Sequence, residues 1–352
     1  MSDEAGATVL ITGGAGFIGS NLADRLAGQG CQVIVVDTLA RPGVERNLNW
    51  LMQRHRGRVR HLATDVRDAQ AIGRAIEGVD GVFHLAAQVA VTTSLVDPRD
   101  DFEVNLLGAF NVLEAARRRG APVIFASTNK VYGDLADVPL ELADDAWLPT
   151  EPTLRARGVD ERRPLDFHTP YGCSKGGADQ YVLDYARSFD LPSCVMRMSC
   201  IYGPRQMGTE DQGWVAHFLI RALAGETITL FGDGRQVRDI LHVGDAVDAY
   251  LAAWRRIDAV KGQAFNLGGG PDNAVSLRQL IARIEHEIGR RASVTYEDWR
   301  AGDQRYFVAD TTAARSALGL GAPIGWRDGL ADLAAWLQAE GELERAPQIA
   351  AA

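Results

Sequence analysis

Hydrophobic and polar positions near the start of the chain predict a strand, a helix and a second strand in quick succession. Residues 8–12 are an apolar run rich in β-branched side chains, residues 20–27 have helical spacing, and residues 32–36 form a second apolar run. Gly30 is expected to end the helix. This order within about 30 residues is typical of a parallel βαβ unit.

The turn between the first strand and the helix is rich in glycine, with Gly13, Gly14, Gly16 and Gly19. Their spacing allows a tight turn, close approach of the backbone to a pyrophosphate, and free N–H groups at the helix start. Asp37 ends the second strand, where a carboxylate binds ribose hydroxyls and repels a 2′-phosphate, so we expect NAD. Arg41 is the nearby residue that would instead favour NADP. The predicted cofactor contacts here are Gly13, Gly16, Phe17, Ile18, Gly19 and Asp37.

Two further strands are predicted at residues 58–62 and 81–87. An acid after the first of them can bind the adenine, although the same segment can alternatively cap a helix over residues 69–76. His84 lies in an apolar strand, and we interpret it as a hydrogen-bonded core residue rather than a catalyst. The further predicted cofactor contacts are Asp65, Val66, Leu85, Ala86 and Ala87.

A polar cluster follows the fourth strand, at the sheet edge where open α/β sheets bind ligands. Ser94 in this cluster can alternatively cap a helix. A long helix is predicted over residues 104–119, with Asn105 on its inner face as a tether for the cofactor strand or the active-site loop. The candidate sugar contacts are Gln88, Thr92 and Thr93.

A tyrosine and a lysine four residues apart provide candidate catalytic groups. Tyr171 and Lys175 share one face of a helix predicted to run to about Phe189, and Thr128 follows a strand at residues 123–127. An ammonium near a phenol lowers the phenol pKa from its usual value of about 10. We therefore predict Thr128, Tyr171 and Lys175 as catalytic. The acidic, proline-rich segment between residues 133 and 171 is expected to form a loop over the mouth of the site.

The second half of the chain carries basic and aromatic residues suited to a nucleotide sugar. Residues 232–239 predict a hairpin turn and a basic strand, and the Arg238 guanidinium matches a diphosphate. Trp214 is either beside the base or part of the core, and Arg305 is either a phosphate contact or part of a solvated salt bridge. Residues 276–288 predict an amphipathic helix capped by its serine. The predicted substrate contacts in this half are Arg205, Gln212, Trp214, Gln236, Arg238, Asp303 and Arg305.

Composition narrows the class of protein. The chain has 352 residues, 46% of them hydrophobic and 24% charged, which suffices for a sizeable core. A net charge of −9 argues against nucleic acid as the partner, and no apolar run reaches the roughly 18 residues of a membrane span. The start of the chain has no signal-peptide pattern, so we expect a cytoplasmic protein. The four cysteines lack C-x-x-C spacing, so we expect reduced thiols and no metal site.

The order of these elements predicts an α/β protein with a Rossmann-type doubly wound parallel sheet and a smaller C-terminal α/β lobe for the substrate. We assign residues 6–198 and about 236–268 to the NAD-binding domain. Residues from about 199–235 and 269–340 are assigned to the nucleotide-sugar lobe, and 341–352 to an alanine-rich tail.

These motifs together resemble the extended short-chain dehydrogenase/reductases, in particular their nucleotide-sugar epimerase and dehydratase group. The resemblance covers nearly the whole chain, from the glycine loop to residues 302–310. It implies that Tyr171 is the general acid/base, that Lys175 binds the nicotinamide ribose and lowers the tyrosine pKa, and that Thr128 hydrogen-bonds the reacting sugar oxygen. It also implies a homodimer or homotetramer, with helices over residues 105–119 and 176–189 at the interface.

The residues after the threonine narrow the reaction. Dehydratases of this group carry Thr-Asp-Glu where this chain has Thr128, Asn129 and Lys130, and water elimination needs a positioned acid and base. Residues 127–134, 169–189 and 198–218 resemble enzymes of the group that epimerise CDP-sugars at C2. That resemblance implies transient oxidation at C2, with Asn129 and Lys130 orienting the sugar.

Two kinds of alternative remain open: another role for Lys130, and another function for the protein. Lys130 can instead be structural, paired with an acid such as Asp134. The alternative enzyme is a 4-epimerase of UDP- or GDP-sugars with the same Thr128, Tyr171 and Lys175. An NAD-binding scaffold without turnover is disfavoured, because the catalytic set is intact.

Overall fold

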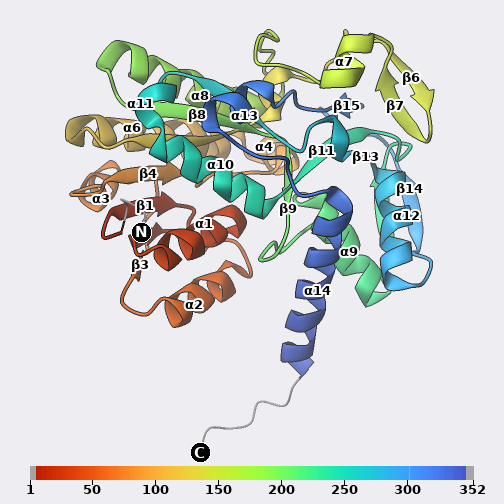
Figure 1. Cartoon of the computed structure of the whole chain (residues 1–352), viewed down its shortest axis with the longest axis horizontal. Coiled ribbons are helices and arrows are strands. Elements are labelled where there is room, and N and C mark those ends of the chain that lie inside the picture. Colours follow the sequence, from red (N-terminus) through yellow and green to blue (C-terminus); the bar gives the residue numbers. More distant parts are fainter. Residues whose placement is uncertain (1–4, 301, 346–352) are drawn as a thin grey trace, which may run out of the picture.

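A computed structural model describes residues 5–300 and 302–345. Its centre is a seven-stranded parallel sheet with the order β12-β8-β5-β4-β1-β2-β3 (Figure 1). The strands are β1 (Thr8–Thr12), β2 (Gln32–Val36), β3 (Val59–Leu62), β4 (Gly81–His84), β5 (Val123–Thr128), β8 (Ser193–Met198) and β12 (Ala264–Leu267). The strand order reverses beside β1, which confirms the predicted Rossmann-type doubly wound sheet.

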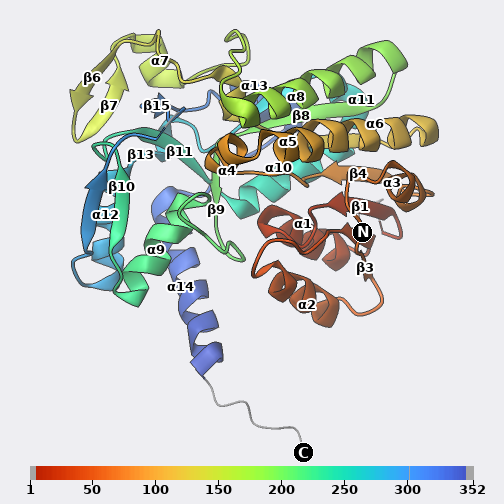
Figure 2. The same ribbon diagram turned by 180° about the vertical axis from the view of Figure 1, so that it is seen from behind.

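Helices cover both faces of this sheet, because successive strand residues point to opposite sides. Val9 and Ile11 of β1 belong to the core on one face, and Leu10 belongs to the core on the other. The helices on the first face are α1 (Phe17–Gly28), α2 (Val44–Arg54), α10 (Val243–Arg255), α11 (Ile257–Val260) and α13 (Thr312–Leu318). On the second face lie α3 (Ala69–Ala75), α6 (Gly108–Arg119) and α8 (Thr169–Phe189), with α4 (Val91–Val96) and α5 (Pro98–Phe102) against α8 (Figure 2).

The C-terminal lobe contains two small sheets. One joins β9 (Cys200–Tyr202), β11 (Val237–His242), β13 (Ala274–Ser276) and β15 (Tyr306–Phe307), and the other pairs β10 (Ile228–Phe231) with β14 (Val294–Glu297). Around them pack α9 (Trp214–Ala224), α12 (Leu277–Ile288) and α14 (Trp326–Arg345). The predicted hairpin across residues 232–239 is wrong, because β10 and β11 belong to different sheets. Strand β11 pairs with β9, β13 and β15 and not with a strand of the large sheet, whereas α10, which follows it, packs in the core of the large sheet.

The segment between residues 133 and 171, predicted to form a loop over the mouth of the site, contains regular elements of its own. It contains an antiparallel hairpin, β6 (Leu140–Ala143) with β7 (Ala146–Pro149), and the short helix α7 (Pro152–Arg157). Ala146 packs in one core cluster with Val237 and Tyr306 of the second lobe. The hairpin therefore packs against the small sheet and does not cover the mouth of the cleft described below.

Several element ends differ from the sequence prediction. Helix α1 ends at Gly28 rather than at Gly30, and α3 is capped by the carboxylate of Asp68 rather than by residues 64–66. The predicted cap of α12 is confirmed, since Ser276 and Gln279 form a reciprocal capping box.

The C-terminal helix α14 continues to Arg345, so the first part of the expected tail is helical. Residues 346–352, with all of the alanines of this tail, lie outside the described residues. Within residues 5–300 and 302–345, no helix is long and apolar enough to cross a membrane.

Candidate active site

The glycine loop after β1 brings backbone segments closer together than other residues would allow. A Cβ atom on Gly13 would lie 2.8 Å from the backbone nitrogen of Ala86, and Gly13 also has a φ of +68°. A Cβ on Gly19 would lie 2.3 Å from the Gly13 carbonyl oxygen. Helix α1 begins at Phe17, so its unpaired N–H groups point to the floor of a cleft of about 1220 Å³.

This cleft brings together the predicted cofactor residues outside the catalytic pair. Along it lie Gly13, Gly16, Phe17, Ile18, Gly19, Asp37, Asp65, Val66, Leu85, Ala86 and Ala87. The Asp37 carboxylate accepts hydrogen bonds from the backbone N–H groups of Ala15 (3.1 Å) and Leu39 (2.9 Å), which fixes it at the end of β2. Arg41 donates a hydrogen bond to the Gln212 side chain instead of pairing with Asp37. The cleft thus fits a dinucleotide with free ribose hydroxyls.

The side chain of Asp65 does not cap α3. It accepts hydrogen bonds from the backbone N–H and the guanidinium of Arg67, and this contact lowers the pKa of the carboxyl. The alternative interpretation of this segment as a helix cap is therefore wrong.

His84 is a core residue, but only one of its ring nitrogens has a partner. Its Nδ1 lies 2.6 Å from the hydroxyl of Thr12, whereas Nε2 is buried without a hydrogen bond. Burial, helped by the charge of Lys175, lowers the pKa of His84 to about 3. The ring is therefore neutral at ordinary pH.

The hydroxyls of Thr128 and Tyr171 meet at the carboxyl end of β5. Thr128 favours the charged form of the phenol, its own hydroxyl donates to the Asn129 side-chain oxygen (3.3 Å), and only 7% of Thr128 and 9% of Tyr171 is exposed. The Ser94 hydroxyl accepts a hydrogen bond from the Tyr171 backbone N–H (3.2 Å) and donates to the Val91 carbonyl (2.7 Å). Ser94 therefore holds the start of α8 and does not cap its own helix, α4.

Lys175 does not contact the Tyr171 phenol, contrary to the sequence prediction. Its ammonium donates a 2.6 Å hydrogen bond to the Ala126 carbonyl and lies over the Phe125 ring. Burial raises the pKa of Tyr171 to about 12, a hydrogen bond from Thr128 opposes this rise, and the Asp101 charge adds to it. Burial also lowers the pKa of Lys175 to about 7. The expected lowering of the tyrosine pKa by Lys175 is thus not observed, because the Lys175 ammonium bonds the Ala126 carbonyl instead.

Asn105 ties the sugar-side loop to the catalytic helix, as its position predicted. Its amide donates to the Gln88 carbonyl (3.0 Å), to Asp101 (3.0 Å) and to the Ser174 hydroxyl (3.2 Å). Gln88 and Thr93 line the cleft, and Thr92 donates to the Asp211 carboxylate (2.9 Å).

A charged cluster connects the turn after β5 with the second lobe. Arg238 pairs with Asp303 at 2.6 Å, and the Lys130 ammonium donates to the Gly302 carbonyl (3.0 Å) and lies 4.0 Å from Asp303. Burial and the nearby Arg238 lower the pKa of Lys130 to about 8. The acid beside Lys130 is therefore Asp303 and not Asp134, a pairing that the sequence could not show because 173 positions separate the two.

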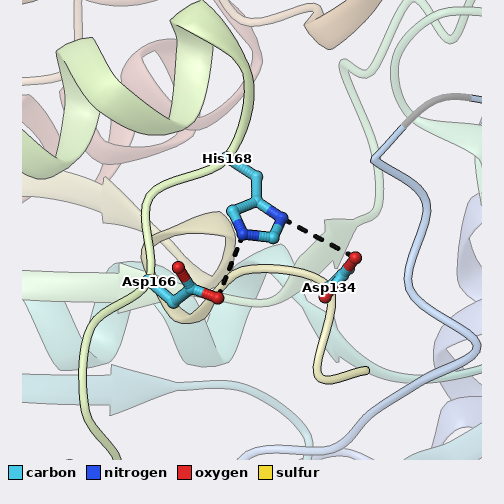
Figure 3. Close-up of side chains that lie close together, drawn as sticks. All are labelled: Asp134, Asp166 and His168. Carbon is cyan, nitrogen blue, oxygen red and sulfur yellow. Dashed lines mark ion pairs between the residues drawn. The ribbon is translucent and has the colours of Figure 1, made fainter. Parts of the chain in front are cut away.

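Asp134 instead belongs to a cluster at the start of the catalytic helix (Figure 3). The two ring nitrogens of His168 lie 3.7 Å from Asp134 and 3.0 Å from Asp166. These three groups also lie close enough together to share a metal ion. Because each ring nitrogen faces a carboxylate, the geometry is that of an ion-paired histidine, which links the turn after β5 to the residue preceding α8.

Of the other predicted substrate residues, Arg205 and Gln212 line the same cleft as the cofactor residues. The Arg205 guanidinium packs over Trp50 and Trp336, and that of Arg305 lies between Trp147 and Trp299 rather than in a salt bridge. Two other predicted substrate contacts, Trp214 and Gln236, each donate a hydrogen bond to another group of the protein. Trp214 donates to the Cys200 sulfur (3.3 Å), and Gln236 donates to the Phe231 carbonyl (2.7 Å), while the Gln236 side-chain oxygen is buried without a partner.

Sequence reasoning missed Gln304 and Asp211. Gln304 is fully buried between Asp303 and Arg305 and hydrogen-bonds the turn after β5. Asp211 joins Thr92 to Arg300. Gln304 could have been found because it lies between two predicted substrate contacts, Asp303 and Arg305. Nothing in the local sequence marks Asp211.

The parallel sheet, the glycine cleft and the Thr128–Tyr171 hydroxyl pair define an enzyme that works with a bound dinucleotide. The chain belongs to the NAD-dependent epimerase/dehydratase family, whose model matches residues 9–268. It is similar to a CDP-paratose 2-epimerase of Salmonella typhi, with 41% identity over 337 residues that cover 93% of this chain and 98% of the relative.

Solved structures agree with this family. A UDP-glucose 4-epimerase of Thermotoga maritima bound to UDP-glucose matches with a TM-score of 0.81 and 30% identity, covering 95% of this chain and 99% of that one. A UDP-glucose 4-epimerase of Thermus thermophilus in complex with NAD matches with a TM-score of 0.77 and 30% identity, covering 94% and 99%. The protein is therefore an NAD-dependent enzyme of the nucleotide-sugar epimerase class.

Proposed function

We propose that this protein is a cytoplasmic nucleotide-sugar 2-epimerase that interconverts CDP-paratose and CDP-tyvelose. What supports epimerisation over dehydration most directly is the turn after β5, where Thr128 is followed by Asn129 and Lys130 instead of two acids. Epimerisation needs one proton acceptor and a ketone that can present either face, whereas water elimination needs a second acid or base. The similarity to a CDP-paratose 2-epimerase over nearly the full length of both chains supports the same substrate.

NAD bound in this cleft would supply the hydride acceptor and donor that oxidation and reduction at C2 of the sugar require. The cleft fits this cofactor: Gly13 and Gly19 leave no room for a side chain where a pyrophosphate would approach, and Asp37 stands at the end of β2. Lys175 is the proposed contact for the nicotinamide ribose.

Tyr171 takes the proton of the sugar 2-hydroxyl as C2 is oxidised, and returns it when C2 is reduced again. Thr128 hydrogen-bonds the same oxygen and stabilises the charge that develops there. Because burial raises the pKa of Tyr171 to about 12, the phenolate is the minor form at neutral pH. Turnover is therefore expected to increase with pH.

The second lobe holds the nucleotide and diphosphate. Arg238 and Asp303 lie nearest to the catalytic turn and are the first candidates for the diphosphate and the ribose. The remaining proposed substrate contacts are Gln88, Thr92, Thr93, Asn129, Lys130, Arg205, Gln212, Trp214, Gln236 and Arg305.

We propose a homodimer or a homotetramer, because α6 and α8 present a row of apolar side chains to solvent. Phe110, Tyr181 and Phe189 are each at least 40% exposed on these helices. A second copy of the chain would cover them.

The second candidate function is 4-epimerisation of a UDP-sugar, which the similarity to the two UDP-glucose 4-epimerase structures favours. The test is to incubate the purified protein, without added cofactor, with CDP-paratose deuterated at C2, and to follow the products by NMR and mass spectrometry. We expect CDP-tyvelose with deuterium retained at C2. Unchanged CDP-paratose would refute this substrate, and C4 inversion of a UDP-sugar in a parallel sample would establish the alternative.

A further inference from the structure

The turn that follows Thr128 is clamped by a single buried side chain from the second lobe. Gln304 accepts a hydrogen bond from the Asn129 amide (3.2 Å) and donates one to the Gly133 carbonyl (2.6 Å). These partners are the first residue of the turn and the residue that follows it. Gln304 is fully buried, so water does not compete for either bond. One amide therefore holds both ends of the turn.

Residues 303 and 304 are also held by Arg238, the residue predicted to bind the diphosphate. Arg238 donates to the Asp303 carboxylate and to the Gln304 carbonyl, both at 2.6 Å. Lys130 adds a second bond from the turn, to the Gly302 carbonyl at 3.0 Å. Residues 302–304 thus form a rigid spacer between Arg238 and Thr128.

This spacing matters for which carbon reacts. In a nucleotide sugar the ring is attached to the diphosphate through C1, so C2 lies next to the anchor and C4 lies across the ring from it. Hydride transfer requires the reacting atoms to approach to about 3–3.5 Å, and a misplacement of about 1 Å can cost about 100-fold in rate. The distance between the diphosphate grip and the Thr128–Tyr171 hydroxyls therefore decides whether C2 or C4 is oxidised.

We propose that Gln304 is a positioning residue that fixes this distance and thereby presents C2 of the sugar for oxidation. The inference rests on the proposed 2-epimerase function. Glutamine suits the position because its amide donates and accepts at once, whereas a glutamate carboxylate could accept from Asn129 but could not donate to the Gly133 carbonyl.

The test compares Gln304→Glu and Gln304→Leu with the wild type and with Gln53→Leu, a control on the exposed side of α2. Each protein is given CDP-paratose, and ketone intermediates are trapped with sodium borodeuteride so that mass spectrometry locates the deuterium. We expect kcat to fall about 10-fold or more in both Gln304 variants, with KM within about 2-fold of the wild type because the nucleotide grip is intact. Deuterium should appear at C4 as well as at C2, whereas the control should label only C2.

Wild-type kcat together with label only at C2 in Gln304→Glu would overturn the inference, as would a lower kcat with label only at C2 and a lower melting temperature, which indicates a purely structural role. If both Gln304 variants fail to fold, Gln304→Asn keeps a buried amide but shortens its reach to Asn129 and Gly133, and the same label pattern decides. Absence of turnover by the wild type refutes the proposed function, whereas an active wild type with unaltered variants refutes only the role of Gln304.

Discussion

The cofactor side and the sugar side of the candidate active site differ in how far apart their residues lie in the sequence. On the cofactor side, Gly13, Gly19 and Asp37 come from one βαβ unit, in which Gly19 packs on Gly13 and the Asp37 carboxylate accepts a hydrogen bond from Ala15 in the glycine loop. On the sugar side, Asn129 bonds Gln304 across 175 positions, and Lys130 bonds Gly302 across 172. A site assembled locally can be recognised in sequence, whereas one assembled from distant segments depends on how the lobes pack.

The largest effect is expected for Tyr171→Phe, which removes the proposed proton acceptor between the cofactor side and the sugar side and leaves both lobes intact. We expect turnover to fall about 1,000-fold, because general acid–base catalysis contributes about 10²–10⁴-fold. Bound nicotinamide cofactor, measured after release from the denatured protein, should be unchanged. The same substitution at Tyr181, an exposed tyrosine on the same helix, is the control and should retain full activity. Substantial activity in Tyr171→Phe would remove this residue from the mechanism.

The local character of the cofactor side is tested by Gly19→Ala. The new methyl group would overlap the Gly13 carbonyl, so the loop must shift, and we expect a loss of about 1–3 kcal/mol in unfolding free energy together with loss of bound NAD. Denaturant unfolding and a cofactor assay measure both. Gly73→Ala in α3, where no atom lies within 4 Å of the new methyl, should keep NAD and gain up to about 1 kcal/mol. Equal behaviour of the two variants would contradict the steric account.

A third test concerns His84, which lies in the sheet between the cofactor side and the sugar side. Its pKa is about 3 in the folded protein and about 6.5 when unfolded, so the unfolded chain binds one more proton between these values. Stability from this group is present above pH 6.5 and is lost as pH falls toward 3, at about 1.4 kcal/mol per pH unit. Denaturant unfolding at pH 7, 6 and 5 should show this slope, and His84→Phe should reduce it. Replacing the exposed His286 with glutamine should leave it unchanged; an equal slope in His84→Phe would refute the assignment.

The smallest expected effect comes from an interaction that is local in sequence but lies in the second lobe. Ser276→Ala removes half of the capping box of α12, which lies in the second lobe but was predicted from sequence, and should cost about 1 kcal/mol of unfolding free energy. Urea unfolding measures the difference. Ser316→Ala, at an exposed site on α13, is the matched control with no expected loss. If the two variants unfold alike, the capping box does not stabilise this lobe.

The sequence by itself determined the doubly wound sheet, the glycine cleft with Asp37, the helix that carries Tyr171 and Lys175, and the cap at Ser276. Each depends on periodicity, on a steric requirement or on spacing within a few turns of chain, and such interactions act between neighbours in the sequence. Asn105 was found in the same way, because a polar residue on the buried face of a helix needs a partner.

Only the tertiary structure decided the rest. It directed Lys175 to the Ala126 carbonyl. It also raised the pKa of Tyr171, because burial disfavours the charged phenolate whatever the spacing of residues along the helix. It separated β10 from β11, because strands pair with whichever edge the fold brings beside them. It also placed Asp303 and Gln304 against the turn after Thr128. These outcomes depend on desolvation and on contacts between segments far apart in the chain, which no local pattern of residues encodes.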